Sequence, residues 1–75
     1  MNWPNIEALI EYDGQINIGY QQPIGCIAVA NDQSNTLAML KRRPKESLED
    51  LLNRLDIAIE RATETDKMVD EINPL

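Results

Sequence analysis

The chain has 75 residues, a formal net charge of −6 and a hydrophobic fraction of 43%, with one Cys, one Trp and no His or Phe. One Cys excludes an internal disulfide and the lack of His argues against a structural zinc site, so self-association is the remaining route to extra stability for so short a chain. The negative charge argues against a general attraction to nucleic acid or to an anionic membrane.

No targeting or membrane-spanning pattern is found. The first residues, Met1-Asn2-Trp3-Pro4, lack the basic and apolar regions of a signal peptide. No apolar run approaches the roughly 20 residues that a membrane helix needs. We therefore expect a cytoplasmic protein with no membrane contact.

The N-terminal third predicts a hairpin. Apolar residues at positions 6, 8, 10 and 12 alternate with Glu7 and Glu11, which is typical of a half-buried strand, and Asp13-Gly14 is a strong turn signal. Residues 15–20 alternate in turn, so a loop of three residues would pair position 12 with 16 and position 10 with 18. The alternative is a short helix over the first stretch, with Pro4 in its first turn and Gly14 as its C-cap.

A second hairpin is predicted from two apolar runs, 24–30 and 36–40, which flank the polar turn 31–35. With a loop of five residues, both faces of this hairpin are apolar. One face carries Cys26, Ala28, Ala30, Ala38 and Leu40, and the other carries Ile27, Val29, Leu37 and Met39.

A long helix is predicted from about Leu48 to Thr63, because apolar residues recur along one stripe at helical spacing. Ser47, with Asp50 at the third helical position, resembles a capping box. We take residues 1–63 as a single domain. Residues 64–75 form an acidic C-terminal extension, either a continuation of the helix, a short second helix or a flexible tail.

The expected fold is α+β, with a small antiparallel sheet of three to four strands (two hairpins) packed on one long C-terminal amphipathic helix. One helix covers one face of such a sheet, and an uncovered apolar face marks an interaction surface. We therefore expect a homodimer through the sheet. Its predicted interface is the set Ile27, Val29, Leu37 and Met39. The alternative is that the first hairpin or the C-terminal segment covers this face.

Two further groups of residues are candidates for contact with a partner. The basic residues before the helix are suited to an anion, either phosphate or an acidic protein, and otherwise act as charged gatekeepers beside an apolar strand. Ile57 lies opposite the apolar stripe of the helix, and Trp3 carries a large ring that either anchors an interface or caps the core. The basic group is Lys41, Arg42, Arg43 and Lys45.

Catalytic chemistry is not predicted. Cys26 lies within an apolar run, which suppresses the thiolate, and neither Ser34 nor Ser47 has a His to activate it. The acidic residues between positions 60 and 71 do not match a calcium-binding loop and are expected to form a solvated face. We predict no enzyme, no catalytic residue, no cofactor and no metal.

Three stretches resemble HicB-type antitoxins: residues 9–14 as a first strand and turn, residues 23–26 with a Pro, Gly and Cys, and residues 47–51 at the start of the helix. In that family the helix follows the Gly-Cys element closely and leads to a further strand. Here a strand and a basic turn intervene, and no strand is expected after the helix. The resemblance assigns no toxin-contacting residue.

The leading functional hypothesis is a small, non-enzymatic interaction or assembly protein that is homodimeric through its sheet and presents its helix or acidic tail to a protein partner. The alternative, which the resemblance suggests, is an antitoxin-like or regulatory protein that binds a basic protein partner. Nucleic-acid binding through residues 41–45 ranks behind both, because no aromatic residues are interleaved with the charges.

Overall fold

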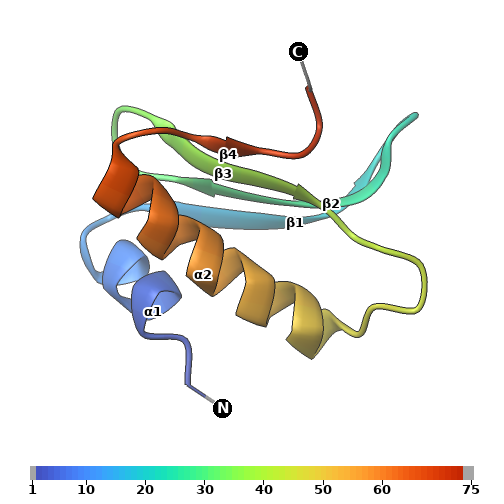
Figure 1. Cartoon of the computed structure of the whole chain (residues 1–75), viewed down its shortest axis with the longest axis horizontal. Helices are drawn as coiled ribbons and strands as arrows, with labels where there is room; N and C mark the ends of the chain where they lie inside the picture. The colour runs from blue at the N-terminus through green and yellow to red at the C-terminus, as the bar shows by residue number, and fades with distance from the viewer. Residues whose placement is uncertain (1, 74–75) are drawn as a thin grey trace.

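A computed structural model describes residues 2–73, which form one four-stranded sheet and two helices on the same side of it (Figure 1). The sheet order is β1-β2-β3-β4. None of the helices in this range has the length and apolar character needed to cross a membrane. In chain order the elements are α1 (Pro4–Glu11), β1 (Gln15–Gln21), β2 (Gly25–Asn31), β3 (Thr36–Lys41), α2 (Leu48–Thr65) and β4 (Val69–Asp70).

The first element is a helix, α1, so the predicted strand over residues 6–12 is wrong and the alternative helix is present, with Tyr12 rather than Gly14 as its C-cap. Pro4 occupies the first turn, where its missing N–H is not needed. The carboxylate of Asp56, from α2, accepts hydrogen bonds from the backbone N–H groups of Asn5 (2.8 Å) and Ile6 (2.9 Å). The alternation of apolar and acidic residues over positions 6–12 predicted a strand. A helix forms instead, because a residue 50 positions away accepts hydrogen bonds from the free N–H groups at the start of α1.

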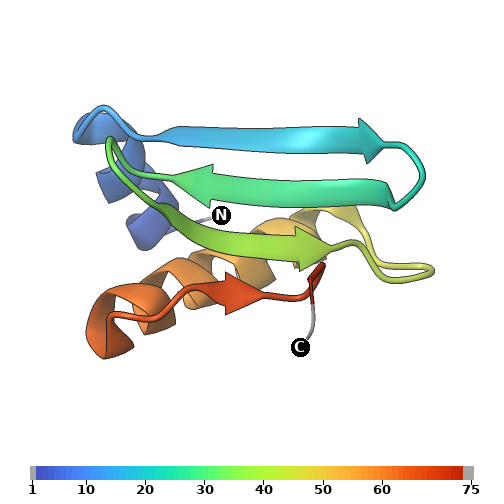
Figure 2. The same cartoon turned by 90° about the horizontal axis from the view of Figure 1, so that it is seen from above.

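The sheet is mostly antiparallel, with β2 between β1 and β3 (Figure 2). Its first strand pairs with β2, in a register that places Ile18 opposite Ala28. The predicted pairing of residues 6–12 with 16–20 therefore does not exist. The predicted strands at 24–30 and 36–40 are present as β2 and β3. The fourth strand, β4, pairs with β3 in parallel, so the sheet is mixed rather than antiparallel as predicted.

The core lies between the sheet and the helices. Small side chains on β2 and β3 bring the backbone of α2 close to the sheet, and Leu51 and Leu55 of α2 are fully buried. Leu9 of α1 closes the core at one end. The buried residues of the sheet are Ala28, Ala30, Ala38 and Leu40, as expected for one face of the predicted hairpin.

Leu37 does not lie with the other three predicted interface residues. Pairing changes register between Ala30 and Asn31, which face Ala38 and Thr36 respectively, so Leu37 is the extra residue of a bulge. Its side chain packs against the core cluster on the helix side. The predicted apolar set on the opposite face is thus reduced to Ile27, Val29 and Met39.

The C-terminal stretch belongs to the fold through residue 73. The helix α2 runs two residues beyond the expected boundary at 63, ends at a left-handed Asp66, and leads to β4. A strand therefore does follow the helix, contrary to expectation. The last two positions of the predicted extension, 74 and 75, lie outside the described residues.

Candidate functional site

Among the residues that the structure describes, no helix or strand covers the face of the sheet turned away from the two helices (Figure 1). Ile27, Val29 and Met39 lie at its centre and are half-buried by their neighbours. Asn17 lies opposite Val29, and Asp70 pairs with Met39. This open face is therefore a small apolar centre within a polar surround rather than a broad apolar patch.

The strand β1 is one of the two edge strands of the sheet, and within residues 2–73 it pairs with β2 alone, along all seven of its residues. Its side chains at 16, 18 and 20 point to the helix side, because their partners on β2 are Ala30, Ala28 and Cys26. The long helix contacts β2, β3 and β4 and does not reach β1. As a result, 38% of Ile18 and 73% of Tyr20 remain exposed.

Trp3 and the buried Asp56 join α1 to α2. The indole Nε1 of Trp3 donates to Asn53 Oδ1 at 2.7 Å. Asp56 is 8% exposed, and its Oδ2 also accepts from the side-chain amide of Asn5 at 2.9 Å. Sequence reasoning missed Asp56, because a carboxylate within a helix gives no local signal that it caps another helix.

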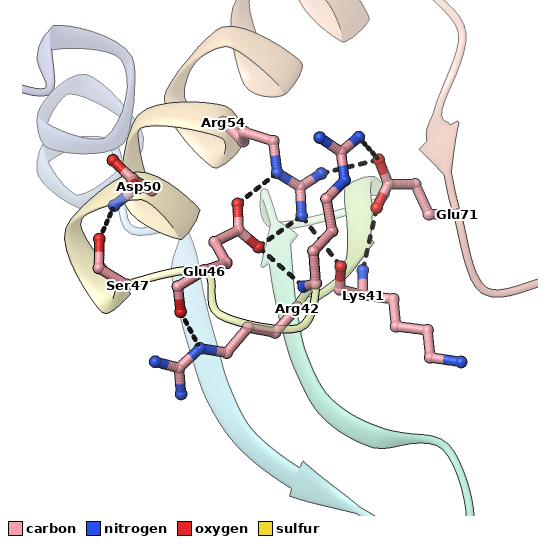
Figure 3. A network of polar contacts seen from close by, with 8 residues as sticks. Lys41, Arg42, Glu46, Ser47, Asp50, Arg54 and Glu71 are labelled. Carbon is pink, nitrogen blue, oxygen red and sulfur yellow. Dashed lines mark hydrogen bonds and ion pairs between the residues drawn. The ribbon is translucent and has the colours of Figure 1, made fainter.

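The basic turn before α2 is held by two glutamates and Arg54 (Figure 3). Arg54 donates from Nε to Glu46 at 2.6 Å and from Nη1 to Glu71 at 2.9 Å. It also donates from Nη2 to the carbonyl oxygen of Lys41 at 2.9 Å. The backbone N–H of Lys41 donates to Glu71 at 3.1 Å, and that of Arg43 donates to Glu46 at 2.9 Å. This network links β3, the turn, α2 and the residue after β4.

The electrostatics of this network favour the charged forms of Glu46 and Arg54. The hydrogen bond from Arg54 lowers the pKa of Glu46 to about 2, and the N–H of Arg43 adds to the effect. Hydrogen bonds to Glu46 and Glu71 raise the pKa of Arg54. Arg54 was not singled out by the sequence, because its partners lie 8 and 17 positions away.

The four predicted anion contacts are partly engaged within the chain. Arg42 Nε donates to the carbonyl oxygen of Glu46 at 2.9 Å, and Arg43 lies 4.0 Å from Glu71. All four residues are exposed. The two glutamates lie among the basic residues and offset part of their charge.

Ile57 lines a hollow between α2 and β4. The hollow has a volume of about 170 Å³, and its floor includes Ala58 and Val69. Ile57 itself is 57% exposed. Three arginines line the hollow together with Glu71, so it combines an apolar floor with a basic rim. The arginines are Arg43, Arg54 and Arg61.

A second cleft, of about 680 Å³, lies where the end of α1, the turn between β2 and β3, and the end of α2 meet. Its lining includes the apolar side chains of Leu9, Leu37 and Met68. Asp32 is the carboxylate of the turn, but its Oδ1 accepts from the backbone N–H groups two and three residues onward, which lowers its pKa. The carboxylate of Asp32 therefore stabilises the turn between β2 and β3.

The other acidic residues and Cys26 do not form a metal site within the described part of the chain. Within residues 2–73, no three Cys, Asp or Glu side chains gather at metal-binding distance. Cys26 is half-buried at the start of β2. Asp70, one of the predicted acidic residues, accepts from the backbone N–H groups of Ile72 and Asn73, and these bonds lower its pKa.

The structure corrects one stretch of the resemblance to HicB-type antitoxins and one of the expected differences from that family. Residues 9–14 close α1 and do not form a strand, whereas a strand does follow the long helix. Gly25, in the second stretch, has a φ of 110° and begins β2. Searches against protein families, curated proteins and solved structures return no match to this chain.

Proposed function

We propose that this chain is a small, non-enzymatic interaction and assembly protein that forms a homodimer through its sheet. A single observation carries the proposal: both helices lie on one side of the sheet, and neither its other face nor the edge of β1 is covered within residues 2–73. Large apolar side chains such as Ile18 and Tyr20 are exposed beside that edge. Uncovered strand edges and exposed apolar side chains are the features that a protein partner buries.

The size of the chain supports self-association. A chain of 75 residues buries a modest share of its surface on folding, and binding a second folded copy stabilises the native state by mass action. A standard interface buries about 800 Å² on each partner, which is roughly 15% of the 5318 Å² that the chain exposes. An interface of this size fits on the sheet and leaves the outer face of α2 accessible.

The solution mass tests this proposal. Sedimentation equilibrium from micromolar to near-millimolar concentration is expected to move from the 8.5 kDa of one chain towards twice that value. A mass of one chain at every concentration would exclude the dimer.

The hollow beside Ile57 favours a second candidate, which is the binding of a separate protein partner. Its basic rim suits an acidic segment that inserts one apolar side chain, rather than the basic partner of the antitoxin-like alternative. The test is an NMR titration with a Glu-rich peptide that contains one Leu. Amide shifts at Ile57 and Val69 are expected with this peptide and not with its Lys-rich counterpart, and the absence of shifts at millimolar peptide would reject the site.

Nucleic-acid binding through residues 41–45 is the candidate we rank last, because Glu46 and Glu71 share the same surface. Fluorescence anisotropy with labelled single-stranded and duplex DNA tests it. Binding that weakens steeply with added salt and is lost in Lys41→Glu would raise its rank.

A further inference from the structure

We propose that the second copy docks on the edge of β1, antiparallel about a twofold axis beside Ile18, so that two four-stranded sheets join into one continuous sheet. This inference rests on the proposed homodimer and names its interface. It differs from the face-to-face dimer expected from the sequence, whose contacts are Ile27, Val29 and Met39.

The direction of the backbone groups on β2 fixes which groups of β1 face outward. The N–H of Arg42 donates to the carbonyl oxygen of Cys26 at 2.9 Å, so the backbone of Cys26 faces β3. Successive residues of a strand alternate in the side to which their N–H and C=O groups point. Ile27 and Val29 therefore direct these groups towards β1.

The pairing of β1 with β2 then determines the direction of the groups on β1. Gly19 lies opposite Ile27, and Asn17 lies opposite Val29, so the backbone groups of Gly19 and Asn17 bond to β2. The backbone groups at positions 16, 18 and 20 point away from the sheet. The turn, loop and cap hydrogen bonds within residues 2–73 do not involve these three positions. The edge thus presents three N–H and three C=O groups in a row.

None of the usual protective devices is present on this edge within the described residues. Natural edge strands avoid pairing with other chains because they carry Lys or Pro, contain a bulge, are short, or are covered by another element. The seven residues of β1 contain no charged side chain and no Pro, and their pairing with β2 has no register shift. The opposite edge differs, because β4 has two residues, one of which is Asp70. The chain therefore leaves one long edge available for pairing.

The sequence of β1, Gln-Ile-Asn-Ile-Gly-Tyr-Gln, is nearly symmetric about Ile18. A twofold axis there places Ile16 opposite Tyr20 of the second copy, and an aliphatic side chain opposite an aromatic one is a favourable cross-strand pair. The two ends place Gln15 opposite Gln21. The outward backbone N–H and C=O groups at positions 16, 18 and 20 then pair with the same groups of the second copy, which gives about six hydrogen bonds between the copies.

Other registers use less of the strand. An axis at Ile16 or at Tyr20 would overlap only three residues of each β1, because the strand ends one residue beyond either position. An axis beside Ile18 overlaps all seven. With this axis the exposed Ile18 side chains of the two copies lie opposite each other, and each exposed Tyr20 lies opposite Ile16 of the other copy. The neutral edge adds no local charge repulsion between two chains of net charge −6.

The first test removes the central hydrogen bonds without disturbing the chain itself. Ile18→Pro deletes an N–H that faces outward, so the pairing of β1 with β2 should survive, as Pro is tolerated on edge strands in this position. We expect circular dichroism to show a folded chain and sedimentation to show a dissociation constant raised by at least about tenfold. The matched control is Val29→Lys on the open face, which is expected to leave the dimer intact.

The second test reports the register. In a background with Cys26→Ala, oxidation of Ile18→Cys should yield a covalent dimer, because facing residues of a hydrogen-bonded pair lie about 5.5 Å apart, within the range for a disulfide. The control Tyr20→Cys should stay uncrosslinked, because its two copies would lie about 13 Å apart along the strands.

The outcomes separate the two proposals. A native dimer that Val29→Lys dissociates and Ile18→Pro does not would overturn the edge interface and leave the homodimer standing. Efficient crosslinking at position 20 and not at 18 would overturn the register. A native chain that is monomeric at all concentrations would overturn the homodimer itself and, with it, this inference.

Discussion

At the residue scale, Asp56 explains how a helix of eight residues persists at the N-terminus. An isolated helix of this length is marginal in water, and no side chain within α1 caps its first turn. The carboxylate of Asp56 accepts both backbone N–H groups and the amide of Asn5, while Trp3 is held by Asn53. The docking of α1 therefore depends on two polar residues of α2.

This arrangement predicts the cost of removing the carboxylate. Asp56→Ala leaves the N–H groups of Asn5 and Ile6 without an acceptor, so we expect the free energy of unfolding to fall by about 2–3 kcal/mol. Asp56→Asn keeps one oxygen at the same site and should cost less. Urea denaturation monitored by circular dichroism measures both. Equal stability of the native chain and Asp56→Ala would contradict the capping role.

Glu46 gives a prediction for the dependence of stability on pH. Its pKa is about 2 in the folded chain, against an ordinary value of 4.5 when it is not engaged by Arg54. A carboxyl group with a lowered pKa contributes stability above its unfolded value, and that contribution is lost as the pH falls through about 4.5 towards 2. After allowance for solvent screening, we expect a loss of about 1–2 kcal/mol from this group.

The matched variant is Glu46→Gln, which cannot titrate at this position. We expect it to be less stable than the native chain at neutral pH and to approach it at a pH of about 2, where Glu46 becomes protonated. Urea midpoints measured across this range provide the comparison. Parallel curves for the two proteins would show that the contact between Glu46 and Arg54 does not contribute to stability.

At the element scale, the sequence predicted what is set by local pattern and missed what is set by distant contacts. Ser47 caps α2 through the N–H of Asp50 at 3.0 Å, as its spacing indicates. The segment 6–12 carries both a strand pattern and a helix pattern, and contacts with α2 decide between them. Leu37 changes face because of a bulge, which alternation alone does not reveal.

The same distinction applies to the candidate dimer surface, of which the sequence pattern predicts one part and the strand order determines the other. Three of the four predicted interface residues lie together on the open face, because the alternation along β2 and β3 places them there. The free edge of β1 could not be identified from the sequence, since it follows from the strand order, and that order depends on residues 4–11 forming a helix instead of a strand. These three residues are Ile27, Val29 and Met39.

The turn between α1 and β1 gives a prediction at this scale. A Cβ on Gly14 would lie 2.5 Å from Leu9 Cδ1 and 2.8 Å from the carbonyl oxygen of Asn31, so α1 could not keep its position against the sheet. We expect Gly14→Ala to cost about 1–3 kcal/mol in thermal or urea unfolding. Gly19→Ala is the control, because no atom lies within 4 Å of its added Cβ. Similar losses at both positions would refute the close approach at Gly14.

At the scale of the whole molecule, the two edges of the sheet have different characters. The β1 edge is long and neutral, while the β4 edge is short and lies beside the arginine-lined hollow of Ile57. A dimer joined at β1 would therefore carry two such hollows, one at each outer edge of the joined sheet. Assembly and partner binding would use separate surfaces of the same chain.

Amide hydrogen exchange along β1, measured by NMR at low and high protein concentration, tests the edge-to-edge dimer most directly. At low concentration the N–H groups of Ile16, Ile18 and Tyr20 should exchange quickly, while those of Asn17 and Gly19 are protected by β2. At high concentration we expect protection at all five positions. Fast exchange at 16, 18 and 20 in a sample that sediments as a dimer would contradict pairing along this edge.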